Sequence, residues 1–179
     1  MFRFLFSFLS LVLLSSCTVS LFPEFDAKII EKIEETNDQA QVLFATVERG
    51  SPASEFASLE PTYNEVLGGL SAILLQVQAR PQPEISERLL ARIVGRERIR
   101  DFCRENEEGR AGDPRACILI VTPFALSEAR ESIAEMRNAH ERLGLGPVLA
   151  ANFVNLFNIS IEQALTVEAA LAGNSGGNQ

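Results

Sequence analysis

The sequence predicts an all-α protein, a compact bundle of five or six helices with one disulfide. Apolar residues recur at steps of three and four positions through most of the chain, which is the spacing of one face of an α-helix. Short segments rich in proline and glycine interrupt this pattern and mark turns between the helices. The 179 residues are enough for one domain, and the bundle is predicted over residues 24–172.

The first helix is predicted over 24–48, and the second ends before the turn at 80–83. The apolar face of the first consists of Phe25, Ile29, Ile33, Ala40, Leu43, Phe44 and Val47. The acidic residues of its other side are Glu31, Glu34, Glu35 and Asp38. The seam of the second helix consists of Tyr63, Val66, Leu70, Ile73 and Val77. Pro61 indicates either that the second helix starts there or that a helix begun near Ala53 is kinked there.

A third helix is predicted over 84–106, with an apolar stripe that rotates around the helix axis near Gly95. After a polar loop, Asp113 and Pro114 form a helix-start signal. The apolar run 117–121 that follows is too short for its period to distinguish a helix from a strand. We interpret this run as a short helix or an extended core segment.

Two further helices are predicted over 123–143 and 147–172. The seam of the first of these consists of Leu126, Ala129, Ile133, Met136, His140 and Leu143. The helix over 147–172 is the most apolar, so it is predicted to be the central helix of the bundle. Residues 173–179, rich in glycine and asparagine, are predicted to be a disordered tail.

The N-terminus has the features of a secretory leader. One positive charge, Arg3, precedes an apolar stretch that ends in two small residues and Cys17. The stretch is shorter than the roughly 20 apolar residues that a transmembrane helix needs. Its end, Leu14-Ser15-Ser16-Cys17, resembles the lipobox of bacterial prolipoproteins, in which the cysteine is lipidated and becomes the new N-terminus.

The resemblance implies that residues 1–16 are a signal peptide and that residues 17–23 form a lipidated tether. Two or three acyl chains on Cys17 would hold the protein durably in a bilayer, whereas one chain holds only marginally. Thr18 rather than aspartate follows the cysteine, and in this class that implies an outer-membrane anchor facing the periplasm. The alternatives are an ordinary cleaved leader and an uncleaved anchor.

The two cysteines beyond Cys17 are predicted to form a disulfide. Cys103 and Cys117 flank a polar loop, and an extracytoplasmic compartment is oxidising enough for them to pair. In the chain-entropy model such a bond stabilises the fold by about 3 kcal/mol. Free thiols and a catalytic or metal-binding pair are the alternatives, although a redox pair more often has the spacing C-x-x-C.

Composition argues against several classes of function. The formal net charge of −8 argues against nucleic-acid binding, which needs a basic surface. His140 is the only histidine and falls on an apolar seam, so we interpret it as a core histidine bonded to a neighbour and not as a metal ligand. The chain has no phosphate-binding glycine motif and no G-x-S-x-G elbow. We therefore predict no enzymatic activity and no cofactor or metal.

Two polar rows remain. The first row consists of Asn152, Asn155, Asn158 and Glu162 on one side of the last predicted helix. This side is the solvent face of the helix or a buried polar seam.

The second polar row consists of Arg88, Arg92, Arg96 and Arg100 at intervals of four residues. Because like charges at this spacing repel each other, we expect compensation from outside the helix. Either the acidic residues of the first helix pack beside these arginines, or the row is a docking face for an acidic partner or anionic lipid headgroups. Plain solvated surface is the third alternative.

The sequence thus predicts a lipid-anchored extracytoplasmic lipoprotein that acts as a protein-interaction or structural module. We expect a protein partner and a membrane contact through the acyl chains of Cys17. The alternative is a bundle that binds a lipid or small hydrophobic ligand between its last helix and the neighbouring ones.

Overall fold

The computed structural model describes residues 27–106 and 112–175. The predictions for residues 1–26, which include the leader, the tether and Cys17, lie outside the described residues, as does most of the predicted tail. The elements are α2 (Ala27–Val47), the short 3₁₀ helix η1 (Ala53–Glu55), α3 (Phe56–Ala79), α4 (Glu87–Val94), α5 (Glu97–Glu105), α7 (Pro114–Leu143) and α8 (Pro147–Ser175). The described ranges contain no strand, and the prediction of an all-α bundle is confirmed.

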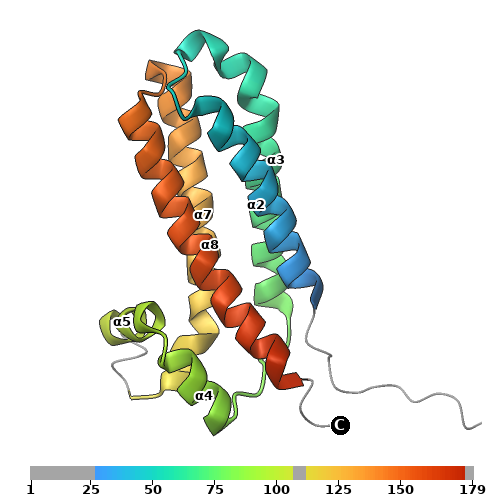
Figure 1. The fold of residues 1–179 in the computed structure, drawn as a ribbon. Coiled ribbons are helices and arrows are strands. Elements are labelled where there is room, and N and C mark those ends of the chain that lie inside the picture. The colour runs from blue at the N-terminus through green and yellow to red at the C-terminus, as the bar shows by residue number, and fades with distance from the viewer. Residues whose placement is uncertain (1–26, 107–111, 176–179) are drawn as a thin grey trace, which may run out of the picture.

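Four long helices, α2, α3, α7 and α8, run alternately up and down and form the main bundle (Figure 1). Its core lies along the seams read from the sequence, with Ile33, Tyr63, Leu70, Leu126 and Ile133 fully or almost fully buried. The helix with the most neighbours is α7, which packs against α3, α4, α5 and α8. The prediction that the last helix is central was wrong, because α8 keeps an exposed face even though most of its residues are apolar.

The second predicted helix starts upstream of its proline. After η1, α3 begins at Phe56 and contains Pro61, so the helix begun near Ala53 is the correct alternative. Farther along α3, a Cβ added at Gly69 would lie 2.7 Å from the Thr36 hydroxyl oxygen of α2. The missing side chain at Gly69 therefore allows α2 and α3 to pack closely.

The apolar run 117–121 is helical and belongs to one long helix. The Asp113 side chain accepts a hydrogen bond of 2.9 Å from the Arg115 backbone N–H, and Pro114 occupies the first turn, so α7 starts as the sequence indicated. The helix continues through Pro123 to Leu143. Burial on two sides keeps it intact, since its first turns contact α4 and α5 and the rest contacts α3 and α8.

The third predicted helix is two helices. It breaks after Gly95 at Arg96, whose backbone is extended with φ −78° and ψ 121°. The break follows from the rotation of the apolar stripe, because a straight helix could not bury both halves against the same neighbours. With the break, both halves join a second, smaller core with the start of α7 and the end of α8. Its buried residues are Leu89, Ile93, Ile99, Cys103, Cys117, Ile118, Val121, Val167 and Leu171.

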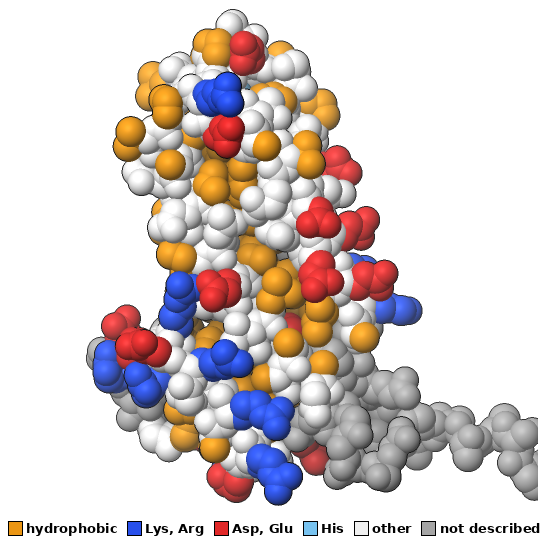
Figure 2. All heavy atoms as spheres, viewed as in Figure 1, with side chains coloured by type: hydrophobic (Ala, Val, Ile, Leu, Met, Phe, Trp, Pro, Cys, Tyr) orange, Lys and Arg blue, Asp and Glu red, His pale blue; other side chains and the backbone are white. Residues whose placement is uncertain are grey.

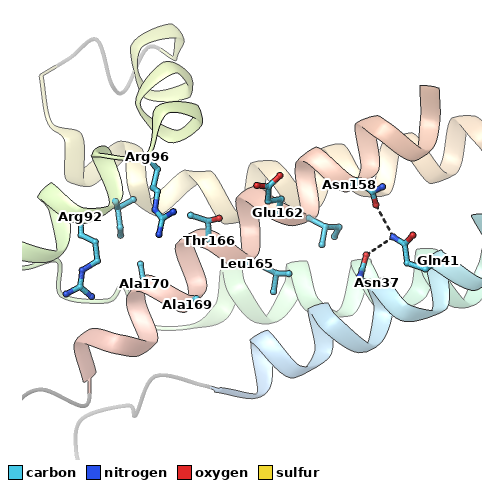
Figure 3. A pocket seen from close by; sticks show the side chains of 12 residues that line it. Asn37, Gln41, Arg92, Arg96, Asn158, Glu162, Leu165, Thr166, Ala169 and Ala170 are labelled. Atoms are coloured by element: carbon cyan, nitrogen blue, oxygen red, sulfur yellow. Dashed lines mark hydrogen bonds between the residues drawn. The ribbon is translucent and has the colours of Figure 1, made fainter. Parts of the chain in front are cut away.

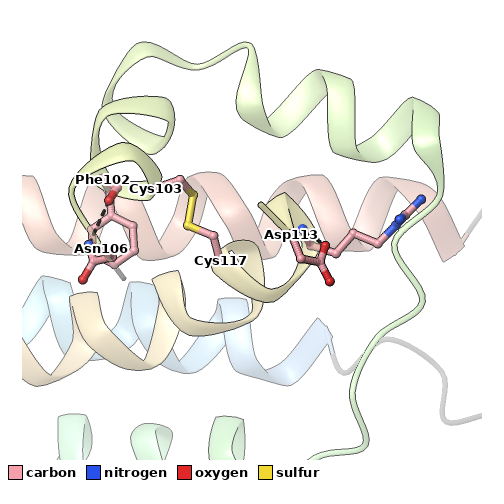
Figure 4. The surroundings of a disulfide bond; sticks show 6 residues. Phe102, Cys103, Asn106, Asp113 and Cys117 are labelled. Carbon is pink, nitrogen blue, oxygen red and sulfur yellow. Dashed lines mark hydrogen bonds between the residues drawn. A yellow bond between two sulfur atoms is a disulfide. The ribbon is translucent and has the colours of Figure 1, made fainter. Parts of the chain in front are cut away.

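The predicted disulfide is present within this second core. The bond joins Cys103 of α5 to Cys117 of α7, whose Cα atoms are 5.6 Å apart (Figure 4). The last helix, α8, extends to Ser175. Residues 173–175 are therefore helical, contrary to the prediction of a tail that begins at 173.

Candidate functional site

The four arginines predicted as an interaction face lie on two short helices. Arg88 and Arg92 belong to α4, Arg96 directly precedes α5, and Arg100 lies within α5. All four are exposed. Because the backbone turns at Arg96, they do not form the single helical row that the spacing suggested.

These arginines have no ionic partner among the described residues. None of their side chains forms an ion pair within residues 27–106 and 112–175. The expectation that the acidic residues of the first helix compensate them was wrong, since α4 packs against α5, α7 and α8, while α2 packs against α3 and α8. Figure 2 shows acidic side chains gathered along one edge of the molecule, and several basic side chains together with a few acidic ones over its lower part.

A groove of about 680 Å³ brings two of these arginines together with α2 and α8 (Figure 3). It follows the face of α8 from Asn158 to Ala170, with α2 at one end and α4 at the other. Its lining residues are Asn37, Gln41, Arg92, Ile93, Arg96, Asn158, Ile161, Glu162, Leu165, Thr166, Ala169 and Ala170. Of the predicted face, the groove includes Arg92 and Arg96 and leaves out Arg88 and Arg100.

The end of the groove near α2 is neutral and occupied by amides. The Gln41 side-chain N–H groups donate to Asn37 Oδ1 at 3.1 Å and to Asn158 Oδ1 at 2.9 Å. This bridge joins α2 to α8 and contributes no charge. Asn158 belongs to the row predicted on the last helix, and all four members of that row are exposed, which confirms the solvent-face interpretation.

The end of the groove near α4 is basic. Glu162 lines the groove, but its carboxylate forms an ion pair with Arg98. Arg92 and Arg96 approach the small residues Thr166 and Ala170 of α8 (Figure 3). Both positive charges are therefore uncompensated by the described part of the chain.

The floor of the groove is largely apolar, and Ile93, Ile161 and Leu165 contribute to it. The groove is open to solvent and is not an enclosed cavity. An apolar floor flanked by polar and charged side chains suits a segment of another macromolecule better than a small molecule, which proteins bury on most sides.

A buried ion pair that sequence analysis missed holds α8 in position beneath the groove. Glu168 is fully buried, and both of its carboxylate oxygens accept hydrogen bonds from Arg80 at the end of α3, at 2.5 and 2.7 Å. The available signal was an acid on the buried side of an apolar helix, between Ala164 and Leu171. By fixing this side toward α3, the pair leaves Thr166 and Ala169 to line the groove.

His140 is a core residue, as predicted. It is fully buried, its Nδ1 lies 3.2 Å from the Tyr63 hydroxyl oxygen, and its Nε2 lies 3.2 Å from the Pro52 carbonyl oxygen. A carbonyl can only accept, so Nε2 carries the proton and Nδ1 accepts from the tyrosine. Burial also raises the pKa of Tyr63 above its usual range. Both ring nitrogens are thus engaged in structural bonds.

The disulfide joins α5 to α7, and neither of its cysteines lines the groove. Cys103 and Cys117 are both buried, which identifies this disulfide as part of the packing between α5 and α7. Near it, the Asn106 side-chain amide donates to the Phe102 carbonyl oxygen at 2.8 Å and completes the last turn of α5 (Figure 4). Residues 27–106 and 112–175 contain no group of three or more metal-ligating side chains.

No protein-family model, curated protein or solved structure has a significant match to this chain. Among the described helices, none combines the length and apolarity that crossing a membrane requires.

Proposed function

We propose that this protein is a bacterial envelope lipoprotein whose helical bundle acts as a protein-interaction module at the membrane. The leader-like N-terminus and the motif Leu14-Ser15-Ser16-Cys17 support cleavage before Cys17 and lipidation of that residue. Thr18 after the cysteine supports an outer-membrane anchor that faces the periplasm. The bundle would then function in a fixed layer next to the bilayer.

The docking site for the partner is the groove between α2, α4 and α8, and its ligand is an acidic segment of another protein. The observation that carries this proposal is the pair Arg92 and Arg96, two exposed cations without an ionic partner in the described chain, beside an apolar floor. They belong to a protein with a net charge of −8, so an acidic partner would be repelled elsewhere and attracted here.

The test is crosslinking in intact cells, comparing the native protein with the double variant Arg92→Glu and Arg96→Glu. We expect a defined protein adduct for the native protein and its loss in the variant, because two attractive contacts become repulsive. The matched control is Arg49→Glu with Arg142→Glu at the opposite end of the bundle, which changes the net charge by the same amount. Equal adduct yields from both double variants would rule out the groove as the docking site.

A further inference from the structure

The groove is long enough to hold one more short helix. Its lining on α8 extends from Asn158 to Ala170, and the 12 steps between these residues, at 1.5 Å each, span roughly 18 Å. That is the length of a helix of about 12 residues, or a little more than three turns.

The arrangement of helices around the groove agrees with this. Both α2 and α4 pack against α8, α2 through the main core and α4 through the second core. Between their contacts α8 presents the half-buried side chains of Leu165 and Thr166 and the small residues Ala169 and Ala170. Half-buried apolar groups leave surface for a partner to cover, and small residues allow the backbone of a neighbouring helix to approach.

The polar and charged groups of the groove determine which charged side chains such a helix needs. The amides at the α2 end are already bonded to each other, and Glu162 is paired with Arg98. Arg92 and Arg96 are the groove cations that form no ion pair among the described residues. Charge complementarity therefore requires carboxylates at the end of the docked segment that lies beside α4.

We infer that the partner docks as an amphipathic helix of about 12 residues along α8, with its apolar face on Leu165 and Ala169 and its carboxylates at Arg92 and Arg96. This inference rests on the proposed docking function and names the form of the ligand. An extended peptide or an anionic membrane surface in the same groove would be a different occupant.

Photo-crosslinking from two positions at a known separation on α8 distinguishes these occupants. A photoreactive amino acid is placed at Asn158 in one variant and at Ala169 in another, in the full-length protein in intact cells. The two positions are 11 residues apart on α8, roughly 16 Å. A docked helix would be crosslinked at two residues about 11 apart in its sequence, whereas an extended segment rising about 3.3 Å per residue would be crosslinked at residues about 5 apart.

The expected result is a single partner segment with crosslinks about 11 residues apart and acidic residues nearest the Ala169 crosslink. The Arg92→Glu and Arg96→Glu change should lower the yield at least tenfold, and replacing the partner's acids with lysine should restore it. The Arg49→Glu and Arg142→Glu control should leave the yield unchanged.

The other outcomes overturn different statements. Crosslinks about 5 residues apart would refute the helix and leave the acidic docking site intact. Adducts to lipid alone, or no protein adduct from either position, would refute both the helix and the proposed docking function. Circular dichroism of each purified variant checks that the bundle has kept its helices, so that a lost adduct is not mistaken for unfolding.

Discussion

At the scale of single residues, the interior of this bundle contains polar pairs whose partners lie on different helices. Tyr63 on α3 donates to His140 on α7, which in turn donates to the Pro52 carbonyl before η1. The rings of Phe56, Tyr63 and His140 also contact one another, with centroids 5.7 to 6.1 Å apart. Such pairs fix the rotation of neighbouring helices about their axes. If one helix rotated, the hydrogen bond would break and a buried polar atom would lose its partner.

The contribution of Tyr63 to the stability of the fold should decrease at alkaline pH. Burial raises its pKa in the folded state, while in the unfolded chain the pKa is about 10. The contribution of Tyr63 to the free energy of unfolding is therefore constant below pH ~10. Above pH ~10 it falls, because at that pH only the unfolded state releases the tyrosine proton. Tyr63→Phe should destabilise the protein by about 1–3 kcal/mol at neutral pH, since it leaves His140 Nδ1 without a donor.

The measurement is urea denaturation of both proteins between pH 8 and 11. The stability difference between them should shrink above pH ~10. Tyr63 is the only tyrosine in the chain, so ultraviolet absorbance follows its ionisation directly. A tyrosine that ionises near pH 10 in the folded protein would contradict the prediction.

Arg80→Ala should be one of the most destabilising single changes in the chain. It leaves the carboxylate of Glu168 buried without its partner, which costs about 3–5 kcal/mol. The control is Arg98→Ala, which breaks the exposed pair with Glu162 and should cost at most about 1 kcal/mol. Chemical denaturation measures both, and similar losses would contradict the assignment. Adding Glu168→Leu to Arg80→Ala should recover part of the stability.

At the scale of elements, α4 and α5 depend on the second core and on the disulfide more than on their own length. They have 8 and 9 residues, and isolated helices of this length are marginal in water. The contacts of Leu89, Ile93 and Ile99 with α7 and α8, together with the Cys103–Cys117 bond, hold them in place. The basic end of the groove is therefore only as ordered as this small core.

Removing the disulfide should loosen this part of the molecule selectively. The double variant Cys103→Ser and Cys117→Ser should lose about 3 kcal/mol of stability in the chain-entropy model. Amide hydrogen exchange should accelerate in α4 and α5, whereas α2 and α3 should keep their protection because their core is separate. Uniformly faster exchange through all helices would show instead that the two cores unfold as one unit.

At the scale of the whole molecule, the ends of the bundle differ. The first described residue of α2 lies at the same end as α4, α5 and the end of α8 (Figure 1). Cys17 and Ala27 are ten positions apart in the sequence, and a chain of that length reaches at most about 35 Å. If Cys17 is lipidated as proposed, this end and the basic side of the groove lie nearest the bilayer, and a partner docked there would itself lie close to the membrane.

Cys17→Ser should release the bundle into the soluble fraction with its helices intact. Lipid chains contribute about 0.8 kcal/mol per buried methylene, and no described helix offers a replacement anchor. Fractionation with and without the change measures the effect, and the Cys103→Ser and Cys117→Ser variant, which keeps Cys17, should stay with the membrane. Persistence of the Cys17→Ser protein in the membrane would show that it has another anchor.

Most helical segments can be predicted from the sequence, because amphipathic periodicity, helix-start signals and turn residues act locally. The seams through Ile33, Leu70 and Ile133 are buried as their spacing predicted, and His140 lies in the core. The pairing of Cys103 with Cys117 also followed from their number and setting. Each of these depends on neighbours within a few residues or, for the disulfide, on two cysteines that flank one loop.

The positions at which helices break or continue, and the faces through which they contact one another, depend on tertiary packing. The division at Gly95 and the continuity of α7 through Pro123 depend on which surfaces need burial. The Arg80–Glu168 pair joins residues 88 positions apart, and no local pattern couples them. The groove is decided in the same way, since Arg92 and Arg96 become a site only where α4 and α2 meet α8. Contacts between distant segments depend on packing, and a single sequence records the faces of its helices but not which face meets which.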